Sequence, residues 1–110
     1  MPLEKITTEV SRRVQETLGS RLRNIILFGS YARGDYDDGS DIDIMVLADV
    51  KEDEIRPIER KLVRIAGDIG LDNDIMVCIM LNDKTLFEER LPILPFYRNV
   101  MNDGVQIYAN

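Results

Sequence analysis

Residues 29–46 read Gly-Ser-Tyr-Ala-Arg-Gly-Asp-Tyr-Asp-Asp-Gly-Ser-Asp-Ile-Asp-Ile-Met-Val, and this stretch decides how the chain is expected to fold. The short apolar run 24–28 precedes it and is closed by Gly29, which is typical of a buried strand. The polar, turn-rich segment 35–39 then leads into a second apolar strand, expected over 41–47. Because this connection is too short for a helical crossover, the sequence predicts an antiparallel pair of strands.

The turn after the first strand has the composition of a phosphate-binding loop. Gly29 has no side chain to keep a phosphate away from the backbone, and Ser30 can donate from its hydroxyl and its N–H. If residues 31–33 begin a helical turn, its positive end adds to the attraction. Arg33 can contact a phosphate or pair with a nearby carboxylate. Together with Ser40, which immediately precedes Asp41, these residues form the candidate nucleotide-binding set.

Two carboxylates, Asp41 and Asp43, stand at the head of the second strand and share one of its faces, because alternate strand residues point the same way. Unpaired, they would repel and one would tend to protonate. A divalent cation removes that conflict, and a two-metal site usually uses a third carboxylate. Asp74 supplies one at the head of a third strand expected over 74–81, and Asp72 remains the alternative. The chain has no histidine, so a carboxylate site favours Mg²⁺ or Mn²⁺.

The remaining apolar spacing alternates between helical and extended patterns. Gly70 is expected just beyond the end of the second long helix, as a stop signal. The order of elements predicts an α/β (α+β) fold, with helices packed mainly on one face of a small mixed β-sheet. For residues 91–97, two interpretations stay open: a helix in the core, or an exposed apolar surface for a partner. Helices are predicted over 3–18, about 55–69, about 84–90 and 96–101, and a short last strand over 105–108.

Composition narrows the class of protein. With 110 residues the chain is expected to form one domain, 1–110. Its 14 basic and 20 acidic residues give a net charge of −6, which argues against binding a long nucleic acid through its phosphates. The single cysteine, Cys78, allows no intrachain disulfide, and no leader-like or membrane-length apolar segment is seen. A cytoplasmic protein that does not contact the membrane is expected.

The pattern Gly29-Ser30-x-Ala32-Arg33-Gly34, followed by Ser40-Asp41-x-Asp43, resembles the signature of the minimal nucleotidyltransferases (MNT), the smallest branch of the DNA polymerase beta superfamily. A looser likeness extends over nearly the whole chain. The resemblance implies the nucleotidyltransferase fold, magnesium and a nucleoside triphosphate such as ATP. It also implies roles for single residues. Asp41 and Asp43 match the metal-binding pair, Asp74 matches a third carboxylate that helps to activate the acceptor hydroxyl, and Gly29 and Ser30 match the triphosphate-binding pair.

Members of this length commonly stand beside a HEPN-domain protein as a toxin–antitoxin pair. The resemblance therefore implies a type VII-like antitoxin that transfers AMP from ATP to a tyrosine of a HEPN toxin, with a hetero-oligomer as a further expectation. Two alternatives stay open. The chain could neutralise a toxin by binding alone, with transfer lost, or it could transfer a nucleotide to a small molecule or an RNA end. The last alternative is weakened by the short, acidic chain, because such acceptors usually need an added domain.

Overall fold

The computed structural model describes residues 2–110 and joins the strands in one mixed sheet of order β3-β2-β1-β4. β1 pairs antiparallel with both β2 and β4, whereas β2 and β3 run parallel. The antiparallel pairing predicted for the first two strands is confirmed. The strands are β1 (Leu22–Phe28), β2 (Ile42–Ala48), β3 (Val77–Asp83) and β4 (Val105–Ala109).

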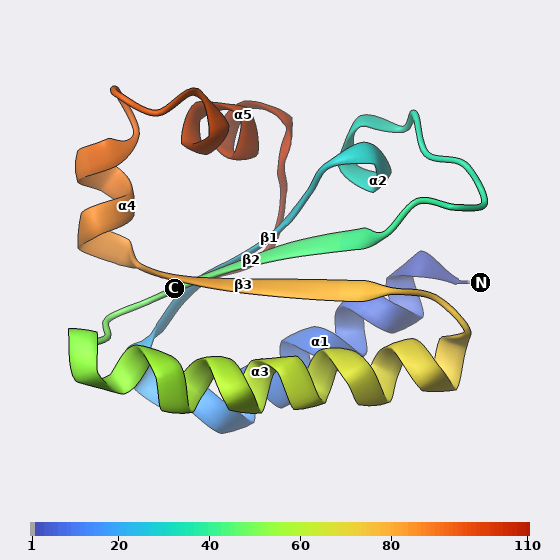
Figure 1. Cartoon of the computed structure of the whole chain (residues 1–110), viewed down its shortest axis with the longest axis horizontal. Helices are drawn as coiled ribbons and strands as arrows, with labels where there is room; N and C mark the ends of the chain where they lie inside the picture. The colour runs from blue at the N-terminus through green and yellow to red at the C-terminus, as the bar shows by residue number, and fades with distance from the viewer. Residues whose placement is uncertain (1) are drawn as a thin grey trace.

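Helices cover both faces of the sheet (Figure 1). The two long helices, α1 and α3, lie together on one face, and the shorter α4 and α5 lie on the other, while α2 follows directly on β1. The mixed α/β fold is as predicted, and the smaller second helical layer adds to the expected arrangement. The helices are α1 (Leu3–Leu18), the 3-10 turn η1 (Gly19–Arg21), α2 (Ser30–Arg33), α3 (Glu52–Asn73), α4 (Lys84–Arg90) and α5 (Pro95–Asp103).

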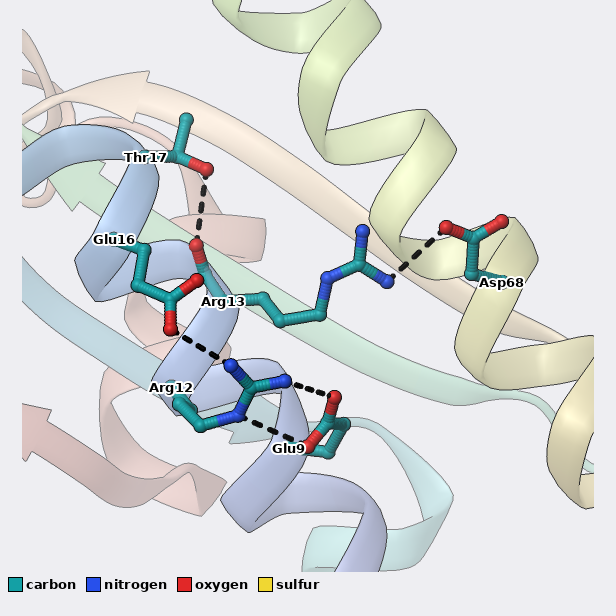
Figure 2. Close-up of polar contacts among 6 residues, drawn as sticks. All are labelled: Glu9, Arg12, Arg13, Glu16, Thr17 and Asp68. Atoms are coloured by element: carbon teal, nitrogen blue, oxygen red, sulfur yellow. Dashed lines mark hydrogen bonds and ion pairs between the residues drawn. The ribbon is translucent and has the colours of Figure 1, made fainter.

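The larger core lies between the sheet and the pair α1 and α3. Apolar residues of α1 recur at helical spacing and are buried there, and alternate residues of β2 meet them from the sheet. The two helices are also joined at their surface, where the Arg13 guanidinium lies 3.1 Å from the Asp68 carboxylate (Figure 2). The β2 residues in this core are Ile42, Ile44, Val46 and Ala48.

A smaller core on the opposite face answers the question left open for residues 91–97. Met45 and Leu47 of β2 are buried there beneath α4 and α5. Tyr97 packs against this core and stacks on the Phe87 ring at a centroid distance of 4.7 Å. Ile93, by contrast, is 72% exposed. The segment thus divides, with part of it packed on the sheet and part open to solvent.

The second long helix extends beyond the predicted 55–69, and this moves the start of β3. Gly70 lies inside α3 rather than after it. Glycine is needed at this position because a Cβ would stand 2.6 Å from the Ile75 carbonyl oxygen of the returning chain. Asp74 ends the helix in the left-handed conformation, with φ of 53°. The reversal needs the residues up to Met76 before an extended strand can begin. The strand predicted over 74–81 is therefore wrong at its start. Within residues 2–110, none of the helices has the length and apolarity to cross a bilayer.

Candidate active site

The turn that follows β1 brings Gly29 against the acidic side of β2. Gly29 has a φ of 73°, and a Cβ at this position would lie 2.5 Å from the Asp43 Oδ2 atom. Glycine is therefore required both by its backbone angle and by the closeness of the carboxylate. Its carbonyl accepts hydrogen bonds from the Ala32 and Arg33 N–H groups, each at 3.1 Å. The single turn α2 thus starts at Ser30, directly beside Asp43.

Asp43 is half-buried near the start of β2, one of the two inner strands of the sheet. It pairs in register with Phe28 of β1 on one side and with Cys78 of β3 on the other. Burial, followed by the negative charge of Asp41, raises the pKa of Asp43, and the positive charge of Arg33 opposes that rise. The predicted strand parity is confirmed for β2, since Met45 enters the core on the Asp43 side and Ile44 the core on the other side.

A surface hollow of about 370 Å³ joins this carboxylate to the turn and to α5. Ser30, Arg33 and Asp43 line it from the sheet side. Asn99 and Asp103 line it from α5, and these are functional candidates that the sequence reasoning missed. Their spacing of four residues, which places two polar groups on one side of a short helix, was the available signal. Three larger hollows lie elsewhere, along α1 and α3, between α3 and β3, and between α1 and β4, and none of them contains Asp43.

Two other residues of the nucleotide-binding set are engaged within the loop that connects α2 to β2. Arg33 Nε donates to Asp35 at 3.2 Å, so this guanidinium both lines the hollow and is held at its rim. Ser40 accepts a hydrogen bond from the Asp37 N–H at 3.0 Å and donates to the Asp37 carboxylate at 3.3 Å. In this structure Ser40 therefore closes the loop and does not line the hollow.

The structure does not bring Asp74 or Asp72 to the acidic pair. Asp74 lies at the C-terminal end of α3, beside the hollow between α3 and β3, and Asp72 lines the one between α1 and α3. Neither is among the charges that shift the pKa of Asp43. Across from Asp43 on β3 stands Cys78, and burial, with the charges of Asp41 and Asp43, raises the pKa of its thiol.

The carboxylate oxygens of this site suit a hard divalent ion whose remaining ligands come from water and a bound phosphate compound. Among residues 2–110, no group of three or more acidic, cysteine or histidine side chains is placed to hold a metal ion. Asp41 and Asp43 nevertheless interact through their charges, and Asp43 is partly desolvated. Mg²⁺ is usually bound by one or two carboxylates, with the remaining positions taken by water and substrate phosphates. Two carboxylates beside a glycine–serine turn fit that mode of binding.

The chain is similar to known proteins along nearly its whole length. The sequence model of the nucleotidyltransferase domain matches residues 3–106. The chain is 35% identical over 107 residues to MJ0141 of Methanocaldococcus jannaschii, which is named as a candidate protein adenylyltransferase. The matched region covers 97% of this chain and 100% of that protein.

Two solved structures are similar in fold. One is a candidate nucleotidyltransferase from Sulfolobus solfataricus, with a TM-score of 0.63 and 25% identity, covering 96% of this chain and 79% of that one. The other belongs to the complex of the tri-AMPylated Shewanella oneidensis HEPN toxin with its MNT antitoxin, with a TM-score of 0.56 and 19% identity, covering 97% and 72%. Because the family match spans both Asp41 and Asp43 and nearly all of the chain, this protein belongs to the nucleotidyltransferase domain family.

Proposed function

We propose that the chain transfers AMP from ATP to a hydroxyl group of a partner protein. The observation that carries the proposal is the meeting of Asp43, Gly29 and Ser30 in one hollow, with the charge of Asp41 acting on Asp43. The name of MJ0141 as a candidate protein adenylyltransferase supports the choice of AMP and of a protein acceptor.

In this proposal the residues of the chain mainly bind and orient. Asp41 and Asp43 would hold Mg²⁺, or Mn²⁺ in its place, which when bound supplies positive charge for the transferring phosphoryl group. Ser30 and the backbone at Gly29 bind phosphate oxygens, and Arg33 adds a positive charge at the rim. The acceptor hydroxyl gives up its proton to solvent water, its oxygen forms a bond to the α-phosphorus, and the bond to pyrophosphate breaks, so that pyrophosphate leaves. Asp74 is left out of this mechanism because it lies at the end of α3.

The α5 side of the hollow gives the nucleotide and the acceptor a second wall. Asn99 presents an amide that can both donate and accept, which suits a base or a ribose. Phe96 lines the hollow and is 44% exposed, and nearby Ile93 and Leu94 are 72% and 40% exposed. Exposed apolar groups at the edge of a site are typical of a protein-binding surface. A protein acceptor that docks there would bring its hydroxyl to the hollow.

We propose a tyrosine of a HEPN toxin as the acceptor. The support is the Shewanella oneidensis complex, in which a HEPN toxin carries three AMP groups and is bound to an MNT antitoxin. The chain would then act as a type VII-like antitoxin, forming at least a transient hetero-oligomer with its target.

Intact-mass spectrometry tests the transfer. The purified chain is incubated with ATP, Mg²⁺ and a HEPN protein encoded beside its gene, and the mass of the partner is measured. We expect an increase of one or more AMP units, which is lost when Asp41 and Asp43 are both changed to Asn. Asp38→Asn is the matched control, since it removes an exposed carboxylate from the same loop. An unmodified partner with the intact chain would contradict the proposal.

One observation favours a second candidate, a module that neutralises its partner by binding alone. The residue beside Asp43 on β3 is Cys78, not a third carboxylate. Toxin neutralisation in cells separates the two functions. Under the transfer proposal the double Asp→Asn variant fails to neutralise the toxin, whereas under the binding proposal it neutralises the toxin as well as the unchanged chain does.

A further inference from the structure

Helix α3 carries an apolar face that no other element of the described chain covers. Val63 is 65% exposed and Leu71 is 85% exposed, and Gly67 lies midway between them. At about 100° per residue, Val63, Gly67 and Leu71 fall within about 40° of one direction. That direction is opposite to buried Leu62 and Ile65, so the face points away from the sheet.

Gly67 has no explanation within a single copy of the chain. A Cβ added there would meet nothing within 4 Å, unlike Gly70, whose Cβ would meet the returning backbone. Glycine is the poorest helix former apart from proline, and this one sits in the interior of a 22-residue helix. A glycine that is not needed for its own fold is the residue expected where a second backbone comes close.

The residues on either side of Gly67 would match those of a second α3 helix that runs antiparallel to the first. Four positions before and after Gly67 stand two exposed apolar residues, Val63 and Leu71. Seven positions before and after stand opposite charges, Arg60 and Asp74, both exposed. Neither takes part in any ion pair found among the described residues. Asp74 lines the same hollow of about 440 Å³ as Gly67 and Leu71, so it belongs to this face.

We propose that this face binds a second copy of the same chain, with the two α3 helices antiparallel and a twofold axis passing beside Gly67. Val63 then packs next to Leu71 of the second copy, and Arg60 pairs with Asp74 of the second copy. The two Gly67 residues meet at the axis, where the absence of side chains lets the helices approach closely. Because a twofold interface uses the same surface on both partners, each of these contacts is made twice.

The surroundings of α3 leave room for this dimer. The side of α3 that faces α1 is already used by the Arg13–Asp68 ion pair (Figure 2). The hollow with Asp43 is lined by residues of α2 and α5, and these two helices lie on the side of the sheet opposite to α3 (Figure 1). Dimerisation through α3 therefore leaves both candidate active sites open to nucleotide and acceptor, and the proposal does not depend on the activity proposed above.

Sedimentation velocity of the full chain over a series of protein concentrations tests the dimer. We expect a dimer for the unchanged chain and a rise in its dissociation constant of at least about tenfold for Leu71→Glu, as for the loss of a buried interface anchor. Ile93→Glu is the matched control, because Ile93 is similarly exposed but lies near α5. A monomeric unchanged chain, or a dimer that Leu71→Glu weakens no more than Ile93→Glu does, overturns the proposal. Thermal melting checks that both variants remain folded.

Disulfide cross-linking tests the position of the axis. In a Cys78→Ser background, which removes the one native thiol, Val63→Cys combined with Leu71→Cys places each new thiol next to a thiol of the second copy and leaves Gly67 unchanged. We expect a covalent dimer after oxidation. Lys61→Cys, exposed on another side of α3, should remain a monomer on a non-reducing gel. Equal cross-linking by Lys61→Cys and by the Val63→Cys and Leu71→Cys variant, or none by the latter, overturns the antiparallel arrangement.

Discussion

The two faces of the β-sheet differ in what their alternate residues meet. On the α1 and α3 face, β2 contributes only apolar side chains to the core. On the other face the same strand changes along its length, from Asp43 at the open hollow to Met45 and Leu47 beneath α4 and α5. Successive residues of one strand thus have different roles, since most of them form the cores and Asp43 lines the hollow. The difference indicates that changes on one face should alter stability and changes on the other should alter chemistry.

The largest effect is expected for Asp43→Asn. It should lower the rate of AMP transfer by about 10³-fold or more, as expected for a group that holds transition-state charge, while the chain melts at the same or a higher temperature. The reason is that burial disfavours the ionised carboxylate, so a neutral amide of similar shape removes that cost. Initial rates and thermal melting measure the two effects. A large fall in melting temperature would show that the two faces are not separable.

Ile44→Ala makes the opposite change one residue along the strand. Ile44 is fully buried against the α1 and α3 layer, and removing its branched side chain should lower the free energy of unfolding by about 2–5 kcal/mol. Urea denaturation measures the loss. At a temperature where the variant is fully folded, its transfer rate should stay close to that of the unchanged chain. A rate as low as that of Asp43→Asn would contradict the comparison.

A smaller effect is expected in the pH dependence of stability. Because the pKa of Asp43 is raised above its ordinary value of 3.8, the folded chain binds this proton at a higher pH than the unfolded chain does. The cost of ionising Asp43 is therefore fully present above the raised pKa and disappears as the pH falls toward 3.8. The stability advantage of Asp43→Asn over the unchanged chain should shrink in the same direction. Urea denaturation at stepped pH values measures it, with Asp38→Asn as the comparison.

The smallest effect on stability is expected for the exposed ion pair between α1 and α3. Asp68→Asn breaks the ion pair with Arg13, in which the Asp68 side chain is 54% exposed. Such a pair contributes less than about 1 kcal/mol, so the variant should differ little from the unchanged chain in urea denaturation. A loss as large as that of Ile44→Ala would mean that the contact between α1 and α3 depends on this pair more than on apolar packing.

Sequence reasoning succeeded where the chemistry is local. The parity of β2 follows from the alternation around Asp43, and the short loop before it determined the antiparallel pairing with β1. It failed where a distant segment decides the outcome. The end of α3 depends on how the chain returns past Gly70, which moved Asp74 away from the acids. The contribution of Asn99 depends on how α5 packs across the sheet. The four-residue spacing of Asn99 and Asp103 indicates a shared side of a helix but not which part of the molecule that side meets.

The α5 side of the hollow has fewer buried residues than the side formed by the sheet. Within α5 only Val100 is buried, whereas six of the seven residues of β1 are buried. Local opening follows the amount of buried contact, so α5 should detach from the sheet at a lower energy than global unfolding requires. Its amide protons should exchange with deuterated water sooner than those of β1. If the proposed transfer takes place in this hollow, such openings give pyrophosphate and the modified side chain a way out that does not require the sheet to move.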